Sequence, residues 1–175
     1  MIGHVFERVS KVTGNIVIVA RTPQQMGKLK QVLQARRITF DELQAQSPLV
    51  GFLTGLRSLR TEYVFCISCD APFIQPLLVR RLFDLAAGKD CAVPMLYGRA
   101  EPLVAVYNRR SALRASKNSL DHGKMSMLDM ITHLKKPFYV SEADLRRTDP
   151  NLLSFQNVNT MFELSKARRI LKALS

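Results

Sequence analysis

The sequence predicts an α/β protein in which helices cover both faces of a central sheet. Continuous apolar runs rich in β-branched residues, at 15–20 and 63–68, are typical of strands that are buried on both faces. Segments with apolar side chains at helical spacing lie between such runs. This alternation predicts a three-layer architecture with a mostly parallel sheet.

The expected elements follow one another in a regular order along the chain. After a short opening helix around Val5, helices are expected at 22–33, 47–59, 76–87, 108–116, 123–133 and 160–174. The expected strands are 15–20, 38–40, 63–68, 91–95, 103–107 and 138–140.

Capping residues set the expected ends of these helices. Thr22 with Gln25 and Thr160 with Glu163 have capping-box spacing, and Asn108 is also a good N-cap. Proline follows Ser47 at the first turn of the next helix. Glycine at position 88 closes the helix that begins near position 76.

Length and composition predict one domain that spans residues 1–175. Hydrophobic residues make up 47% of the chain, which is too many for a disordered protein. The longest apolar runs fall far short of the roughly 20 residues that a membrane span needs, and no secretory signal is recognisable at the N-terminus. We therefore expect a cytoplasmic location and three reduced cysteines.

The chain is strongly basic, with 26 Lys and Arg against 14 Asp and Glu and a net charge of +12. Such a charge favours anionic partners such as nucleotides and phosphorylated small molecules. The basic doublets are spread along the whole chain, and few aromatic residues accompany them. A nucleic-acid interface is therefore not expected from the charge alone.

Asp70 is the first candidate for chemistry. It directly follows the strand expected at 63–68, and ligands of such sheets bind beyond the carboxyl ends of the strands. A carboxylate there suits Mg²⁺, which takes one or two protein oxygens together with substrate phosphates. The structural alternative, that Asp70 only caps the following helix, stays open.

Three other groups of candidate residues also have structural explanations. Asn157 and Asn159 precede the last expected helix, where an amide oxygen could be a second metal ligand, although Asn is also common in loops. Cys66 and Cys69 have C-x-x-C spacing, but Cys66 lies within an apolar strand, so we expect core packing. His122 lies in an expected loop, where a substrate contact stays open.

Five short motifs occur in a characteristic order. They are SPLVG at 47–51, CDAP at 69–72, EPLVAVY at 101–107, GKMSM at 123–127 and NVNT at 157–160. In this order and spacing the chain resembles the molybdenum cofactor guanylyltransferases, which belong to the MobA-like nucleotidyltransferases. The resemblance covers nearly the whole chain.

The resemblance implies a Rossmann-like nucleotidyltransferase fold and transfer of a guanylyl group from GTP to molybdopterin with Mg²⁺. Asp70 and Asn159 match the family's metal-binding residues. The segment that lines the nucleotide base in the family is matched by Pro48, Leu49 and Gly51. A segment near the acceptor is matched by Glu101 and Pro102.

The chain departs from the family pattern at its start. The family opens with an apolar strand and a Gly-rich phosphate loop, whereas positions 1–9 match the helix after that loop. We therefore expect the first strand and the phosphate loop to be missing. We also expect the strands at 15–20 and 63–68 to pair directly or to recruit a strand from another copy.

Alternative functions remain open from the sequence. One is a non-catalytic member that binds a nucleotide, a cofactor or a protein, which the missing loop favours. Another is a nucleotidyltransferase with a different phosphorylated acceptor. Nucleic-acid binding is a further alternative function. A homo-oligomeric state also stays open.

Overall fold

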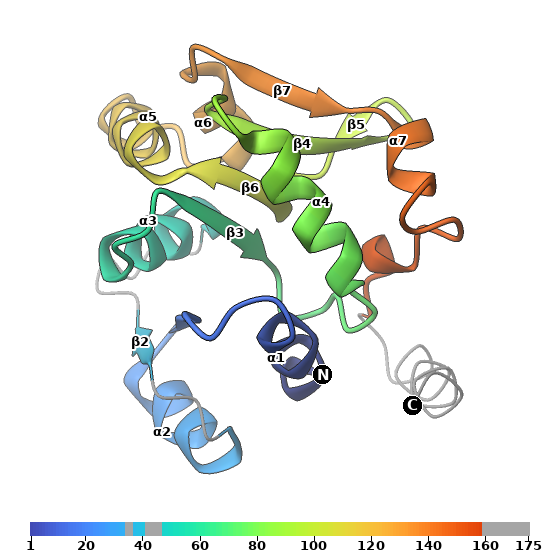
Figure 1. Ribbon diagram of the computed structural model, residues 1–175. Helices are drawn as coiled ribbons and strands as arrows, with labels where there is room; N and C mark the ends of the chain where they lie inside the picture. The colour runs from blue at the N-terminus through green and yellow to red at the C-terminus, as the bar shows by residue number, and fades with distance from the viewer. Residues whose placement is uncertain (34–36, 41–46, 159–175) are drawn as a thin grey trace.

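The computed structural model describes residues 1–33, 37–40 and 47–158 (Figure 1). Its helices are α1 Ile2–Ser10, α2 Pro23–Val32, α3 Pro48–Ser58, α4 Pro76–Ala86, α5 Arg109–Asp121, α6 Met127–Thr132 and α7 Glu142–Arg146, with the 3₁₀ turn η1 Leu153–Phe155. Its strands are β1 Ile18–Ala20, β2 Ile38–Phe40, β3 Tyr63–Ile67, β4 Cys91–Leu96, β5 Arg99–Ala100, β6 Val104–Asn108 and β7 Pro137–Val140. The helix expected at 160–174 lies outside the described residues.

The described strands form two separate sheets. β1 and β2 pair in parallel, and the larger sheet has the order β3-β6-β4-β5, with β7 also paired to β4. Its β4–β7 pairing is parallel, whereas β6 runs antiparallel to both β3 and β4. The expected mostly parallel sheet is therefore met only in part, because the connection from β4 to β6 is too short for a crossover over the sheet.

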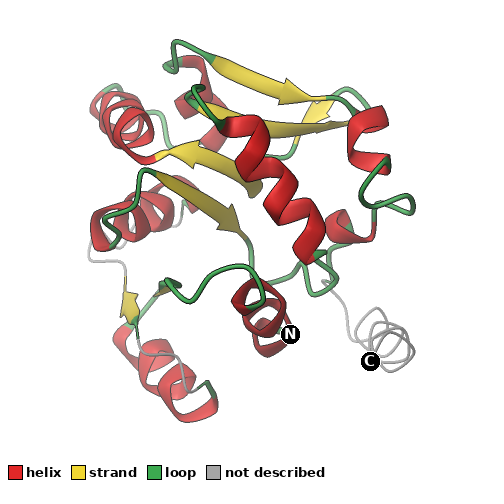
Figure 2. Cartoon of the chain, viewed as in Figure 1, coloured by secondary structure: helices red, strands yellow, loops and turns green. Residues whose placement is uncertain are grey.

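Helices cover both faces of the larger sheet, as the sequence predicts (Figure 2). One apolar cluster joins α3, α5 and α6 to one face, and the other joins α1, α4 and α7 to the opposite face. Successive residues of β6 alternate between them, with Ala105 and Tyr107 in the first and Val104 and Val106 in the second. The three-layer prediction is confirmed by this arrangement.

The expected helix caps are present in the described residues. Thr22 Oγ1 accepts a hydrogen bond from Gln25 N at 3.1 Å, and Asn108 Oδ1 accepts one from Ser111 N at 3.1 Å. Gln25 reaches back to Arg21 N at 2.7 Å. No described helix has the length and apolar character that a bilayer span requires.

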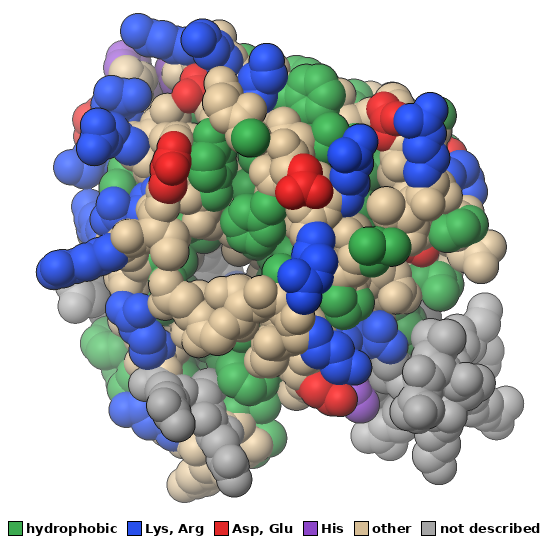
Figure 3. Space-filling view, in the orientation of Figure 1, with side chains coloured by type: hydrophobic (Ala, Val, Ile, Leu, Met, Phe, Trp, Pro, Cys, Tyr) green, Lys and Arg blue, Asp and Glu red, His purple; other side chains and the backbone are tan. Residues whose placement is uncertain are grey.

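β1 and β3 do not pair with each other, so the first alternative, direct pairing, was wrong, and a strand from another copy stays a prediction. Among the described residues β3 pairs only with β6, and β1 pairs only with β2. Figure 3 shows the surface hollowed between β3 and the segment that leads into β1. Helix α3 joins the two sheets instead, since it belongs to the core of the larger sheet and also packs against β1.

Two glycines of α3 face Val19 of β1. A Cβ placed on Gly55 would meet Val19 Cγ2 at 3.4 Å, and one on Gly51 would meet Val19 Cγ1 at 4.0 Å. Larger side chains at position 55 would push α3 away from β1, because a packed interior resists added volume.

We predict that Gly55→Val destabilises the protein by about 1 to 3 kcal/mol, because its added methyl groups overlap Val19. The matched control is Gly27→Val in α2, since a Cβ there meets nothing within 4 Å. Urea denaturation measures both. Equal stability of the two variants would contradict close packing of α3 on β1.

Candidate functional site

Asp70 lies just beyond the carboxyl end of β3, where the sequence places it. Its side chain is half-buried, and Ser68 Oγ donates a hydrogen bond to its Oδ1. Ser68 N donates to Leu103 O at 3.2 Å, so the end of β3 stays joined to the start of β6. These bonds hold the carboxylate at the edge of the sheet without burying it.

The last described segment of the chain packs against the loop that carries Asp70. Val158 N donates to Asp70 O at 2.9 Å, and Gln75 N donates to Ser154 Oγ at 3.0 Å. Asp149 fixes this segment in turn, because its carboxylate accepts from Leu153 N at 3.0 Å and from Ser154 N at 2.7 Å. Two hydrogen bonds that involve the backbone therefore join segments some 80 positions apart, and the two bonds of Asp149 order the later segment from within.

The two asparagines of the candidate metal site flank this junction. Asn157 is exposed and directly precedes Val158, whose N–H bonds to Asp70. Asn159 follows Val158 and lies outside the described residues. The structure thus brings Asn157 and Val158 to the loop of Asp70, and the pairing of Asp70 with Asn159 stays a prediction.

Glu101 and Pro102 lie at the same edge of the sheet as Asp70. Ile67 at the end of β3 pairs with Val104 at the start of β6, so the residues after β3 and before β6 are neighbours. The buried Tyr107 hydroxyl donates to Pro102 O at 2.8 Å. Burial raises the pKa of Glu101.

The three residues predicted to line the nucleotide base lie at the start of α3 and differ in exposure. Pro48 is exposed and Gly51 is half-buried, whereas the Leu49 side chain is completely buried in the core. Leu49 N is also occupied, because it donates to Ser47 Oγ at 3.1 Å. Leu49 therefore positions α3, and only Pro48 and Gly51 remain available to a ligand.

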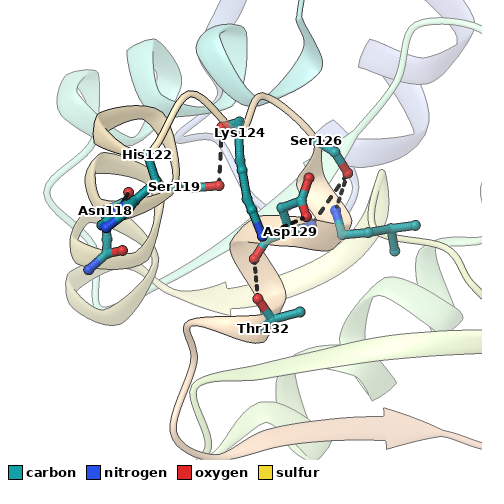
Figure 4. A network of polar contacts seen from close by, with 8 residues as sticks. Asn118, Ser119, His122, Lys124, Ser126, Asp129 and Thr132 are labelled. Carbon is teal, nitrogen blue, oxygen red and sulfur yellow. Dashed lines mark hydrogen bonds and ion pairs between the residues drawn. The ribbon is translucent and has the colours of Figure 1, made fainter.

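A polar network orders the loop between α5 and α6, next to the start of α3 (Figure 4). Ser47 Oγ donates to Met125 O and so ties the two segments together. Ser119 Oγ donates to Lys124 O at 3.2 Å, and Lys124 Nζ lies 3.7 Å from Asp129 Oδ1. The motifs at 47–51 and 123–127, which are distant in sequence, are thus in contact.

The His122 side chain takes part in helix capping. Its Nδ1 lies 2.8 Å from Asn118 O in the last turn of α5. This contact gives His122 a structural role.

The cysteines divide by exposure. Burial raises the pKa of the Cys66 thiol to about 12 and that of Cys91 to about 11. Cys69, directly before Asp70, is exposed. The burial of the Cys66 thiol agrees with the prediction that Cys66 packs in the core.

The residues present fit a hard divalent cation that is shared with phosphates. Among the described residues no three His, Cys, Asp or Glu side chains converge, so this part of the chain offers no cage made only of protein ligands. Asp70 supplies one carboxylate at an open edge, which is how Mg²⁺ is usually bound beside substrate phosphates.

Three positioning residues of this site were not predicted. They are Ser68, Asp149 and Ser154, all of which act through hydrogen bonds to the loop of Asp70 or to the segment beside it. Asp149 stands before Pro150 and Asn151, a turn signal that marks a loop but does not reveal its distant partner.

Comparison with known proteins gives the family of the chain. The model of the MobA-like NTP transferase domain matches residues 1–136. A molybdenum cofactor guanylyltransferase of Desulfosudis oleivorans is 35% identical over 174 residues, covering 99% of this chain and 83% of the relative. A "Probable molybdenum cofactor guanylyltransferase" of Methanosarcina mazei is 33% identical over 164 residues, covering 90% of this chain and 73% of the relative.

A solved structure shares the fold. The crystal structure of molybdopterin-guanine dinucleotide biosynthesis protein A from Archaeoglobus fulgidus matches with a TM-score of 0.82 and 27% identity, covering 98% of this chain and 85% of that one. The fold is therefore the Rossmann-like nucleotidyltransferase fold, and the chain belongs to the family of MobA-like NTP transferases.

Proposed function

We propose that the protein transfers a guanylyl group from GTP to molybdopterin and releases pyrophosphate. The observation that carries this proposal is the junction of Asp70 with the segment of Asn157 and Val158 at the carboxyl end of β3. The relatives named molybdenum cofactor guanylyltransferase support the choice of nucleotide and acceptor.

The reaction needs charge compensation more than a protein nucleophile. A phosphate oxygen of the acceptor bonds to the α-phosphorus of GTP, and the bond from that phosphorus to the pyrophosphate oxygen breaks. Asp70, with Asn159, would hold Mg²⁺. The bound ion would neutralise charge on the phosphates.

The other segments would bind and orient the two substrates. Pro48 and Gly51 would face the nucleotide base, while Leu49 keeps α3 in place from the core. Glu101 and Pro102 would lie beside the acceptor, held by the Tyr107 hydroxyl. The positive charge of the chain would attract both polyanionic substrates.

A second candidate function is nucleotide binding without transfer. Release of pyrophosphate from GTP and molybdopterin separates the two functions, because both require binding and only the first requires turnover.

We predict that Asp70→Asn lowers kcat/KM for GTP by more than about 100-fold, since even outer-shell partners of a catalytic metal contribute 10- to 100-fold. Calorimetry with GTP and Mg²⁺ should also show weaker binding of GTP to Asp70→Asn than to the wild type. Asp84→Asn on the exposed side of α4 removes the same charge away from the site and serves as the control. Unchanged binding and turnover in Asp70→Asn would remove Asp70 from the site.

Thiol labelling gives an independent test of the same site. At neutral pH iodoacetamide should modify only Cys69, because the raised pKa values keep Cys66 and Cys91 protonated and unreactive. GTP with Mg²⁺ should slow this labelling, since Cys69 adjoins Asp70. Mass spectrometry locates the label, and Asp70→Asn should lose the protection. Equal labelling rates with and without nucleotide would contradict a site at this edge.

A further inference from the structure

A second concave site lies at the end of the larger sheet opposite Asp70. The pairs Tyr63 with Asn108 and Cys91 with Pro137 mark this end, whereas Asp70 follows the other end of β3. The hollow has a volume of about 600 Å³, within the range of small-molecule sites. We call it the basic cleft because four cations line it: Lys89, Arg114, Lys135 and Lys136.

The cations of the basic cleft come from three parts of the chain. Lys89 lies in the turn before β4, Arg114 on α5, and the other two in the loop before β7. An adjoining hollow of about 410 Å³ adds Arg60, Arg109 and Arg110. Figure 3 shows Lys and Arg side chains gathered along this side of the molecule, at the left of the view.

Asp90 fixes the backbone of the basic cleft and forms no ion pair with the cations that line it. Its carboxylate accepts hydrogen bonds from Ser111 Oγ at 2.6 Å and from the N–H groups of Lys135 and Lys136 at 2.8 Å each. Partial burial alone would raise the pKa of Asp90, but these hydrogen bonds and the charge of Arg114 lower it below its ordinary value. The backbone of the lysine loop is therefore fixed, and its two ammonium groups stay available.

None of the four cations forms an ion pair within the described part of the chain. The ion pairs found there involve Lys124, Arg146 and Arg147. Glu62 is the other acid that lines the cleft, and it is exposed. Cations gathered with so little compensation repel one another, and a multiply charged anion would relieve this repulsion.

The lining favours phosphate groups over nucleic-acid bases. Its one tyrosine, Tyr63, is engaged through its hydroxyl, which accepts from Gly88 N at 2.9 Å and donates to Lys89 O at 3.3 Å. The described lining thus lacks the several aromatic platforms on which single-stranded nucleic acids stack. Lys and Arg are well suited to phosphate oxygens.

We propose that the basic cleft is a binding site for an oligophosphate group, that is, two or more linked phosphates of a small molecule. The site is separate from the edge that carries Asp70 and does not depend on the proposed function.

Calorimetry with inorganic tripolyphosphate tests the proposal, with the full chain freed of divalent metals. We expect binding that weakens by about tenfold or more in the triple variant Lys89→Gln, Lys135→Gln and Lys136→Gln, because several charge-assisted hydrogen bonds are lost. The triple Lys→Arg variant should keep the affinity and shows that charge, not folding, is tested. Asp70→Asn should also keep it, which separates this site from the catalytic proposal.

A charge-matched control excludes a general effect of net charge. Arg21→Gln, Lys28→Gln and Lys30→Gln remove three exposed cations from α2 and the residues before it, and this variant should bind tripolyphosphate like the wild type. No binding to the wild type, an equal loss in this control, or an unchanged affinity in the cleft variant would overturn the proposal. Tighter binding of a single-stranded DNA oligonucleotide than of tripolyphosphate would overturn it in favour of a nucleic-acid surface.

Discussion

The hydrogen bond from Val158 N to Asp70 O is the contact on which the candidate active site depends. The strand before Asp70 places the carboxylate at the edge of the sheet, but it cannot supply the second polar group. In the proposed site that group would come from the segment around Val158, and the bond between Gln75 N and Ser154 Oγ holds the same two segments together a few residues away. Asp149 is 3% exposed and its two oxygens accept backbone N–H groups of η1, so the segment is fixed before any ligand arrives.

The two ends of the larger sheet have opposite electrostatic character. At one end Asp70 and Glu101 provide carboxylates beside an open edge, which suits a cation and the phosphates that accompany it. At the other end the carboxylate of Asp90 fixes the lysine loop through its backbone and leaves the surrounding ammonium and guanidinium groups facing solvent. A basic chain can thus attract anions over its whole surface and still bind them differently at its two ends.

Much of the fold could be predicted from local patterns, and the misses have physical causes. Apolar runs and capping residues predict most of the strands and helices, because burial and N-cap hydrogen bonds act within a few residues, whereas α7 and the short β5 were not predicted. The antiparallel direction of β6 was missed, although the connection from β4 is too short for a crossover. In the site, Asp70 was found from its place after a strand, whereas the buried side chain of Leu49 and the partners of Asp149 depend on tertiary packing that no local pattern encodes.

The central claim is that Asp70 and the segment that carries Asn157 and Val158 form one metal and nucleotide site. Paramagnetic broadening by Mn²⁺ with GTP, measured on backbone amide signals, tests it most directly, because the effect falls steeply with distance from the ion. The account predicts the strongest broadening at Cys69, Asp70 and Val158. Strongest broadening at Lys135 and Lys136, with sharp signals at Asp70, would contradict it.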